Sequence, residues 1–567
     1  MIHMRPNSWV RVIAASFLIA PFALAQTGGK TIDAQGHHWW QHAVFYEVYP
    51  RSFADSNNDG IGDLNGITSK LDYLKGLGID AIWITPCFPS PQVDFGYDVS
   101  DYEAIDPMYG TLADFDRLVA EAKKREIRVI LDFVVNHTSD QHPWFLDSKS
   151  SRTSAHRDWY IWRDGKGKGQ PPNNWTSTFG GSAWEFDPKT NQYYYHYFYK
   201  QQPDLNWRNP AVQKAMLDVT RWWYKRGVAG MRLDAVDTLF EDPNLTDNPS
   251  RQEKNAFGDL LQEHKYNTKL PEVHEALRDL RKVADEYNSV LIGETWTANI
   301  GELNEYYGKG NNELQMPMDF LFTTVNKLSA PEFRKQIAAI NSAAGWPTFV
   351  ISNHDIARSF DRYGDGQHND QIAKLMAALY LTLRGTPILY YGEEIGMKTT
   401  MPARREDVKD PIGRSGWPKE KGRDGERTPM QWDGSNNAGF SKGTPWLTVP
   451  ATAKIYNVAD ESNDPNSILT FYKNVLKLRH TNRELREGNY VPLNQNDPNV
   501  LSYLRVYGDQ AVLVALNMSG SAQTVDFKIS KNGFASAKGL LATNNSSARG
   551  DIVKLEPYGV FIGQLVR

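Results

Sequence analysis

The chain has little cysteine, no excess of charge of one sign and few long hydrophobic runs. Its 567 residues include a single cysteine, Cys87, which excludes an intrachain disulfide. Because Cys87 follows the apolar run 81–85, we expect a buried structural thiol. Lys and Arg total 63 against 67 Asp and Glu, and no run of five or six like charges occurs. This balance argues against binding of nucleic acid or an anionic membrane and suits a neutral small-molecule substrate.

The long apolar stretch lies at the N-terminus. Arg5 and Arg11 precede an apolar segment at 12–20, and Ala23-Leu24-Ala25 supplies a small-residue cleavage site. We interpret residues 1–25 as a cleavable secretory signal peptide. An uncleaved membrane anchor is the alternative, but the segment is short for a membrane span and contains Pro21. We therefore expect a secreted protein, periplasmic in a bacterium, with no membrane association after cleavage.

The rest of the chain predicts an α/β fold, a (β/α)8 TIM barrel. The composition is globular, with 40% hydrophobic and 23% charged residues and 17 Trp, 27 Tyr and 24 Phe. Short apolar runs alternate with amphipathic stretches, such as 212–226 and 273–287, whose apolar positions recur every three or four residues. Eight strand–helix units are typical of this barrel. The runs are Val44–Tyr49, Ala81–Thr85, Val129–Asp132, Gly230–Asp234, Val290–Glu294, Leu314–Met318, Thr348–Ser352 and Pro387–Tyr391, of which the sixth is the weakest.

Two segments depart from this alternation. Residues 137–206 follow the third run, are rich in Trp, Tyr, Asn and Gly, and are far longer than an ordinary βα loop, which predicts an inserted lid domain. After a helix-like segment at 467–479, apolar residues alternate at 500–506, 511–516, 525–529 and 553–565, with a turn at Gly508-Asp509. We therefore expect a catalytic barrel in two parts, 26–136 and 207–483, and a C-terminal antiparallel β-domain at 484–567.

Acidic residues and histidines stand at the ends of four apolar runs. These residues are Asp132, Asp234, Glu294 and the pair His354-Asp355. The C-terminal ends of barrel strands meet on one rim, so we expect these side chains to converge there. Glycoside hydrolysis needs one carboxylic acid to protonate the leaving oxygen and a carboxylate to meet the anomeric carbon. A catalytic metal site is the rival interpretation, but it would favour two or three histidines with an open position.

Together with three longer motifs, these residues resemble the α-amylase superfamily, glycoside hydrolase family 13. The motifs are Phe45–Phe53, Gln202-Pro203-Asp204-Leu205-Asn206 and Arg427-Thr428-Pro429-Met430-Gln431-Trp432. The second and third are similar to signatures of the α-glucosidase and oligo-1,6-glucosidase group. The resemblance covers nearly the whole chain after residue 25.

The resemblance implies a retaining glycosidase with three catalytic carboxylates. Asp234 resembles the nucleophile, Glu294 the acid/base, and Asp355 the third carboxylate, which binds sugar hydroxyls. Asp234 must then be ionised and Glu294 protonated when the reaction begins. Arg232 lies two residues before Asp234 on the same strand face and would keep that carboxylate charged. The alternative for this pair is a purely structural ion pair.

The resemblance also implies a subsite for the terminal glucose. Asp94 and Tyr97 resemble its floor, where a tyrosine ring stacks on the sugar. The hydroxyl-binding partners would be His137, His354 and Arg427, and the lid would supply an aglycone wall from Phe179, Phe198 and Gln202. For these three lid residues, core packing is the alternative.

A second constellation predicts a structural metal site. Asp55, Asn57, Asp59 and Asp63 place oxygen side chains at alternate positions around Gly60, like the start of an EF-hand loop, although the twelfth-position Glu is missing. The resemblance adds the carbonyl of Ile61 as a ligand and implies Ca2+, with Mg2+ as the alternative ion. A solvated turn rich in Asp and Asn is the alternative structure. No organic cofactor is expected.

These inferences predict a secreted, exo-acting α-glucosidase that hydrolyses α-1,4 bonds in maltose and maltooligosaccharides. In the family, a small residue such as Ala235 after the nucleophile goes with α-1,4 bonds and Val with α-1,6 bonds. Sucrose-isomerising relatives carry Arg-Leu-Asp-Arg-Asp where this chain has Phe360–Asp365, so isomerisation is not expected. The alternatives are an oligo-1,6-glucosidase or a glucosyltransferase, and more remotely a non-catalytic, membrane-anchored accessory protein. The sequence gives no indication of the oligomeric state.

Overall fold

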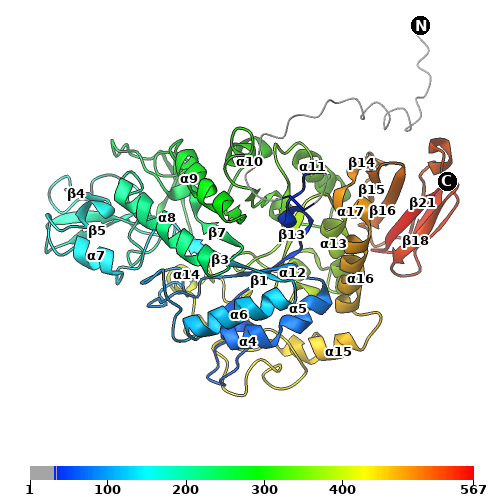
Figure 1. Cartoon of the computed structure of the whole chain (residues 1–567), viewed down its shortest axis with the longest axis horizontal. Helices are drawn as coiled ribbons and strands as arrows, with labels where there is room; N and C mark the ends of the chain where they lie inside the picture. The colour runs from blue at the N-terminus through cyan, green and yellow to red at the C-terminus, as the bar shows by residue number, and fades with distance from the viewer. Residues whose placement is uncertain (1–30, 33–34) are drawn as a thin grey trace, which may run out of the picture.

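Eight parallel strands form the centre of the molecule (Figure 1). The computed structural model describes residues 31–32 and 35–567, so the predicted signal peptide lies outside the described residues. The strands pair in the order β11-β10-β7-β3-β2-β1-β13-β12, each next to its sequence neighbours, which confirms the TIM barrel. They are β1 (Phe45–Val48), β2 (Ala81–Ile84), β3 (Arg128–Val134), β7 (Gly230–Asp234), β10 (Val290–Gly293), β11 (Met316–Pro317), β12 (Thr348–Val350) and β13 (Thr386–Tyr390).

The sixth run, whose apolar pattern was the weakest, forms the shortest strand of the barrel. Only Met316 and Pro317 of that run are in a strand. Pro317 has no N–H to donate to a ladder, which limits pairing on that side. The ring closes between β11 and β12 through a single parallel bridge, in which the Asp319 N–H donates to the Thr348 carbonyl at 3.3 Å.

Amphipathic helices surround the barrel, as the spacing predicted (Figure 1). In α9, Leu277, Leu280 and Ala284 are fully buried at three- and four-residue intervals. Helix α6 begins with a capping box between Thr111 and Asp114. The principal helices are α5 (Leu71–Leu77), α6 (Leu112–Lys124), α8 (Pro210–Lys225), α9 (Val273–Glu286), α10 (Ile300–Tyr307), α11 (Ala330–Ile340), α13 (Asn369–Thr382) and α16 (Ile468–Thr481).

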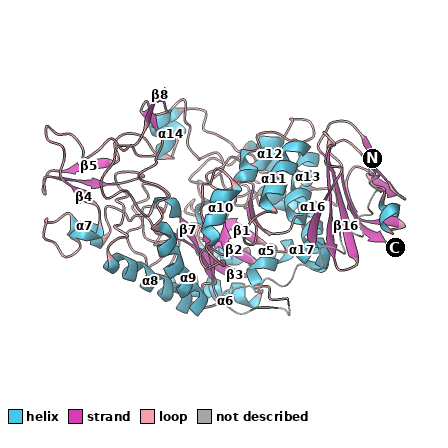
Figure 2. Cartoon of the chain, turned by 90° about the horizontal axis from the view of Figure 1, so that it is seen from above, coloured by secondary structure: helices cyan, strands magenta, loops and turns pink. Residues whose placement is uncertain are grey.

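The insertion after β3 forms a small unit at the end of the molecule opposite the C-terminal sheet (Figure 2). It contains α7 (Pro143–Ser148) and an antiparallel sheet of β4 (Trp162–Arg163), β6 (Gln192–Tyr195) and β5 (Trp184–Asp187). Its core is aromatic, with Trp175, Trp184 and Tyr195 in mutual contact. The Leu205 N–H donates to the Asn136 carbonyl at 2.9 Å, which ties the end of the insertion to the end of β3.

The C-terminal residues form antiparallel sheets, as predicted. The turn at Gly508-Asp509 joins β15 (Val500–Tyr507) to β16 (Gln510–Asn517). Two details of the prediction are wrong. The run 525–529 is a strand only to Asp526, and 553–565 is two strands, because Tyr558 adopts a left-handed φ of 52° between them. The other strands are β14 (Asn489–Leu493), β17 (Gln523–Asp526), β18 (Ser536–Ala542), β19 (Ser547–Arg549), β20 (Ile552–Leu555) and β21 (Val560–Val566).

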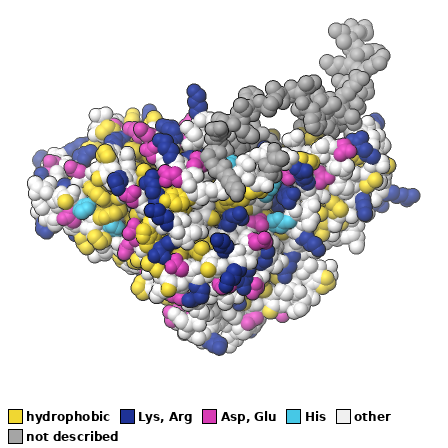
Figure 3. Space-filling model, in the orientation of Figure 1, with side chains coloured by type: hydrophobic (Ala, Val, Ile, Leu, Met, Phe, Trp, Pro, Cys, Tyr) yellow, Lys and Arg dark blue, Asp and Glu magenta, His cyan; other side chains and the backbone are white. Residues whose placement is uncertain are grey.

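Three further features of the described residues concern the cysteine, the surface charges and the hydrophobicity of the helices. Cys87 is fully buried, and burial raises the pKa of its thiol to about 12. Basic and acidic side chains are interspersed over the face seen in Figure 3. No helix within 31–32 and 35–567 is long and apolar enough to cross a membrane.

Candidate active site

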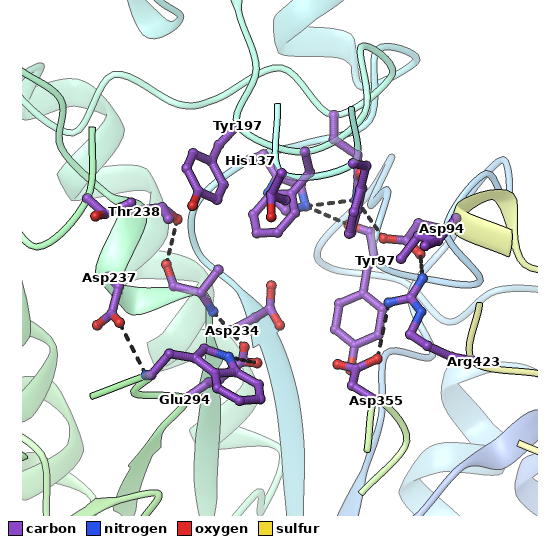
Figure 4. Close-up of a pocket in the computed structure, with 18 of the residues that line it drawn as sticks. Asp94, Tyr97, His137, Tyr197, Asp234, Asp237, Thr238, Glu294, Asp355 and Arg423 are labelled. Atoms are coloured by element: carbon purple, nitrogen blue, oxygen red, sulfur yellow. Dashed lines mark hydrogen bonds and ion pairs between the residues drawn. The ribbon is translucent and has the colours of Figure 1, made fainter. Parts of the chain in front are cut away.

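Three carboxylates from three barrel strands face one cavity of about 420 Å³ (Figure 4). Asp234 is the last residue of β7, Glu294 directly follows β10, and Asp355 follows β12. All three lie on the C-terminal rim, where a parallel barrel gathers residues that are distant in sequence. Six of the nine predicted substrate contacts also line the cavity, and the other three are fully buried behind it. The first group is Asp94, Tyr97, His137, Phe179, Phe198 and Gln202, and the second is Arg232, His354 and Arg427.

Arg232 lies beneath the cavity and contacts several carboxylates at once. Its Nη1 donates to Asp234 Oδ1 at 2.6 Å and to Asp132 Oδ1 at 3.0 Å. Its Nη2 lies 2.9 Å from Glu294 Oε2. One cation therefore faces three acids, so the positive charge of Arg232 cannot balance all three carboxylates when they are ionised.

Asp234 and Glu294 share one buried environment above Arg232. Burial raises the pKa of the Asp234 carboxyl, and the adjacent Glu294, with which it hydrogen bonds, raises it further against the pull of Arg232. Burial likewise raises the pKa of Asp132, to about 6. The Glu294 carboxyl also accepts hydrogen bonds from Trp296 Nε1 at 2.9 Å and from the Ala235 N–H at 3.1 Å. The contact with Arg232 is the interaction that favours the ionised form of Asp234.

Ala235, directly after Asp234, has a left-handed backbone. Its φ is 46° and its ψ is 43°, which is uncommon for a residue other than glycine. This conformation points the Ala235 N–H at Glu294. Local strain of this kind is held by surrounding structure and gathers at functional sites.

Asp355 lies across the cavity from Asp234, beside Arg423 (Figure 4), and is held by Arg423 and Arg427. Arg427 Nη2 lies 2.6 Å from Asp355 Oδ1 and Arg423 Nη1 lies 3.1 Å from the same oxygen. Although burial opposes it, the neighbouring His354 and the two arginines hold the pKa of Asp355 well below its usual range. Asp355 is therefore ionised over the whole physiological range of pH.

Arg423 is a central site residue that the sequence did not predict. Its Nη2 donates to Asp94 Oδ1 at 2.7 Å and its Nε to Asp410 Oδ2 at 2.8 Å. Together with its bond to Asp355, these contacts tie the cavity residues Asp94 and Asp355 to Asp410. The sequence signal that could have identified it is the charged stretch 423–426, which directly precedes the motif 427–432.

Tyr97 forms part of the cavity floor, above His354. The two rings are stacked, with centroids 5.4 Å apart and an interplanar angle of 11°. The Tyr97 hydroxyl lies 2.6 Å from His354 Nε2 and donates to Asp132 Oδ2 at 3.1 Å. His354 Nδ1 in turn lies 2.6 Å from Glu47 Oε1 on β1. The Tyr97 ring is therefore held by His354 and Asp132 where it lines the cavity.

The lid residues both pack and line the cavity. The rings of Phe179 and Phe198 lie 5.4 Å apart. Gln202 is fully buried, and its Nε2 donates to Asp94 Oδ2 at 3.2 Å and lies 3.1 Å from His137 Nε2. The lid is thus joined to the floor of the pocket through side chains that the sequence singled out.

The mouth of the cavity contains residues with no predicted role. Trp296, two residues after Glu294, is 47% exposed and stacks on Phe320 at 4.3 Å. Its place beside a strand end was the signal that could have found it. The remaining lining residues come mainly from the lid, the β7–α9 connection and α14 (Pro411–Gly416), and include Tyr197, Asp237, Thr238, Lys269 and Ile412.

The predicted metal loop is a compact turn between α3 (Pro50–Phe53) and α4 (Leu64–Ser69). Asp55 accepts hydrogen bonds from the N–H groups of Asn58 at 2.7 Å and Gly60 at 2.8 Å. Asp63 caps α4 by accepting from the Gly66 N–H. Within the described residues, no group of three or more His, Cys, Asp or Glu side chains is placed to hold a metal ion. The donor set of carboxylates, the Asn57 amide and a backbone carbonyl nevertheless has the chemistry of a hard cation site.

Family comparisons match this architecture. The family model described as the α-amylase catalytic domain matches residues 47–488, and that of the maltogenic amylase C-terminal domain matches 490–562. The chain belongs to glycoside hydrolase family 13. It is therefore a glycoside hydrolase of family 13, and its homologues include α-glucosidases and oligo-1,6-glucosidases.

Relatives within family 13 align along nearly the whole chain. A probable α-glucosidase of Rhizobium meliloti (strain 1021) is 42% identical over 93% of this chain and 97% of its own length. An oligo-1,6-glucosidase of Parageobacillus thermoglucosidasius is 38% identical over 89% of this chain and 94% of its own length. Among solved structures, an α-glucosyl transfer enzyme has a TM-score of 0.85 and 39% identity, covering 93% of this chain and 99% of its own. Isomaltulose synthase from Erwinia rhapontici NX5 has a TM-score of 0.87 and 38% identity, covering 95% and 100%.

Proposed function

We propose that the protein is an exo-acting, retaining α-glucosidase that releases terminal α-1,4-linked glucose from maltose and short maltooligosaccharides. The observation that carries the proposal is Arg423, which lines the cavity and bridges Asp94 and Asp355. We infer that this bridge closes one end of the cavity. A pocket with one closed end accepts the terminus of a chain and excludes its interior. The buried polar groups around that end provide hydrogen-bonding partners for the hydroxyls of one hexose.

In the proposed mechanism, Asp234 attacks the anomeric carbon while Glu294 protonates the glycosidic oxygen. A covalent glucosyl–Asp234 intermediate forms, and Glu294 then takes a proton from the water that cleaves it. Two observations support retention over inversion: Asp234 and Glu294 hydrogen bond to each other, and one guanidinium contacts both. An inverting enzyme needs its carboxyl groups about 6.5–9.5 Å apart to admit water between them.

A substrate panel with product stereochemistry tests this proposal. We expect maltose and maltotriose to be cleaved from the non-reducing end, and proton NMR to detect α-glucose before mutarotation. Initial release of β-glucose, or internal cleavage of long maltooligosaccharides, would contradict the proposal.

The proposed preference for α-1,4 bonds is supported by Ala235. Its small side chain stands next to the nucleophile, and it lines the cavity. Ala235→Val is expected to raise the isomaltose-to-maltose ratio of kcat/KM by about tenfold, within the range for a methylene-sized change in a pocket. A β-branched residue at a positive φ is also disfavoured, so we expect a lower melting temperature. A wild-type enzyme that already prefers isomaltose would support the oligo-1,6-glucosidase alternative.

Glucosyl transfer is a second candidate, supported by the similarity to an α-glucosyl transfer enzyme. A covalent intermediate can react with an alcohol in place of water. Product analysis at high maltose concentration separates the two: predominant trisaccharide would identify a transferase, and predominant glucose a hydrolase. Because Phe360–Asp365 differs from the isomerase motif, we expect no isomaltulose or trehalulose from sucrose. The convergence of all three carboxylates argues against a non-catalytic accessory protein.

We also propose that the loop 55–63 holds a structural Ca2+, with Mg2+ as the alternative ion. The ligands would be Asp55, Asn57, Asp59, Asp63 and the carbonyl of Ile61. Such an ion stabilises the folded state by mass action. In metal-free buffer, 1 mM CaCl2 is expected to raise the melting temperature by several degrees. Asp59→Asn should reduce this increase, and an unchanged melting temperature in wild type would contradict the site.

For localisation, we propose cleavage after Ala25 and export to the periplasm, supported by the N-terminal sequence alone. Mass spectrometry of the protein from cells is expected to find a mature N-terminus near Gln26. Retention of residues 12–24 would support the membrane-anchored alternative.

A further inference from the structure

Trp446 lies outside the cavity, between the loop 55–63 and the back of the glucose subsite. Its ring is partly buried, stacks at 6.3 Å on Tyr49 and lies 4.6 Å below the Arg51 guanidinium. Tyr49 in turn stacks on His354 at 6.2 Å. Phe95, next to the floor residue Asp94, packs on the edge of Trp446 at 5.2 Å. Trp446 therefore supports three residues that adjoin the subsite floor.

Two hydrogen bonds connect Trp446 to the backbone of Arg427, whose side chain contacts the third carboxylate, Asp355. Trp446 Nε1 donates to Ser52 Oγ at 2.9 Å, and Ser52 Oγ donates to the Arg427 carbonyl. The Arg427 side chain then contacts Asp355 at 2.6 Å. Ser52 and Arg427 are both fully buried, so no water replaces these bonds at low cost.

The other end of Trp446 is fixed to the loop 55–63. The Trp446 N–H donates to the Gly60 carbonyl at 3.0 Å. Gly60 has a φ of +92°, and a Cβ there would lie 1.9 Å from the Thr444 carbonyl oxygen. A Cβ on Gly443 would lie 2.3 Å from the Asn58 carbonyl oxygen. The two backbones are thus packed so closely that the position of the loop determines the position of Trp446.

We propose that Trp446 is a positioning residue that sets the geometry of the Arg427–Asp355 pair and thereby the affinity of the glucose subsite. The inference deepens the proposed α-glucosidase function and rests on the role of Asp355 in binding the terminal sugar. Trp446 touches neither substrate nor reacting carboxylates. Its effect should therefore appear in sugar binding more than in the chemical step.

The test compares Trp446→Phe and Ser52→Ala with wild type on the α-glucoside that wild type cleaves fastest. Both substitutions remove the indole-to-serine link, and Trp446→Phe retains an aromatic ring. We expect KM and the inhibition constant of glucose to rise about fivefold, the size expected for one lost hydrogen bond, with kcat within about twofold. Because both residues act in one series, the double variant should be little worse than either single variant.

The lid contains a matched control. Trp162 Nε1 donates to Ser148 Oγ at 2.9 Å, and Ser148 Oγ donates to the Arg157 carbonyl at 3.1 Å, but Arg157 contacts no cavity carboxylate. Trp162→Phe and Ser148→Ala should lower the melting temperature without changing the inhibition constant of glucose.

Three outcomes would overturn the inference: an unchanged inhibition constant in Trp446→Phe and Ser52→Ala, equal increases in the control pair, or additive effects in the double variant. If Trp446→Phe does not fold, Ser52→Ala decides alone, since it leaves the indole in place. A wild type that cleaves no α-glucoside would instead contradict the proposed function, which keeps the two failures distinct.

Discussion

The two sides of the cavity differ in the number of cations per carboxylate. On the side that we propose binds the sugar, Arg423 and Arg427 both contact Asp355, and the pKa of that carboxyl lies well below its usual range. On the side that we propose for cleavage, Arg232 alone faces Asp132, Asp234 and Glu294, and burial raises the pKa of Asp234. Two arginines share three carboxylates around Asp355 and keep that carboxyl ionised, whereas one arginine for three carboxylates leaves the pKa of Asp234 raised.

The largest expected effect tests the cleavage side. In Asp234→Asn the nucleophile is lost while the shape is kept, so kcat should fall by at least about 10⁴-fold. The circular dichroism spectrum should be unchanged. The melting temperature should not fall, because the substitution removes the charge of one of three buried acids that share Arg232. Asp218→Asn, on an exposed part of α8, is the control and should retain full activity. Near-normal turnover in Asp234→Asn would remove the nucleophile assignment.

A smaller effect is expected on the binding side. Lys has no planar fork with which to bridge Asp94, Asp355 and Asp410, so Arg423→Lys should raise KM by about 100-fold with a smaller change in kcat. A single ammonium group cannot keep all three contacts, so its attraction for Asp355 weakens and the pKa of Asp355 moves up toward its ordinary value. Since Asp355 must be ionised, activity should then be lost at a higher pH as the pH falls. Arg404→Lys, at an exposed ion pair, is the control, and an acid limb identical to that of wild type would contradict the comparison.

The smallest effect concerns Glu461, a buried acid that forms no ion pair with the described residues and feels Lys374 only weakly. Glu461 is 7% exposed and makes no ion pair with any described residue, and burial raises its pKa to about 8. The native state therefore binds more protons than the unfolded chain above about pH 4.5, so stability falls as the pH rises and this contribution is gone above about pH 8. Glu461→Gln should match wild type at pH 5 and melt a few degrees higher at pH 9. The exposed variant Glu406→Gln should show the wild-type slope, and parallel curves for Glu461→Gln and wild type would be evidence against this account.

Much of this comparison could be predicted from the sequence. Asp234, Glu294 and Asp355 each end or follow an apolar run, and a strand end fixes where a side chain emerges on the rim. The run itself supplies the signal, because burial on both faces of a parallel strand demands continuous apolar residues. The eight strands were predicted for the same reason, and the weakest run became the shortest strand.

Arg423 was missed because its position depends on the path of a loop. It lies in the connection after β13 and reaches Asp94, which is more than 300 residues earlier in the chain. No periodic pattern in the sequence predicts where a loop brings such a side chain. The hairpin of β8 (Ser250–Lys254) and β9 (Leu260–Gln262) was missed likewise, because its strands are largely exposed and do not alternate in polarity.

The two-residue strand β11 has a consequence for the pocket. Glu294 follows β10 on one side of β11, and Asp355 follows β12 on the other, where a single bridge closes the ring. A barrel is expected to open first between the two strands that are joined by the fewest hydrogen bonds. We therefore expect the distance between Glu294 and Asp355 to depend on this closure, and amide hydrogen exchange around Asp319 to be faster than in the other barrel strands.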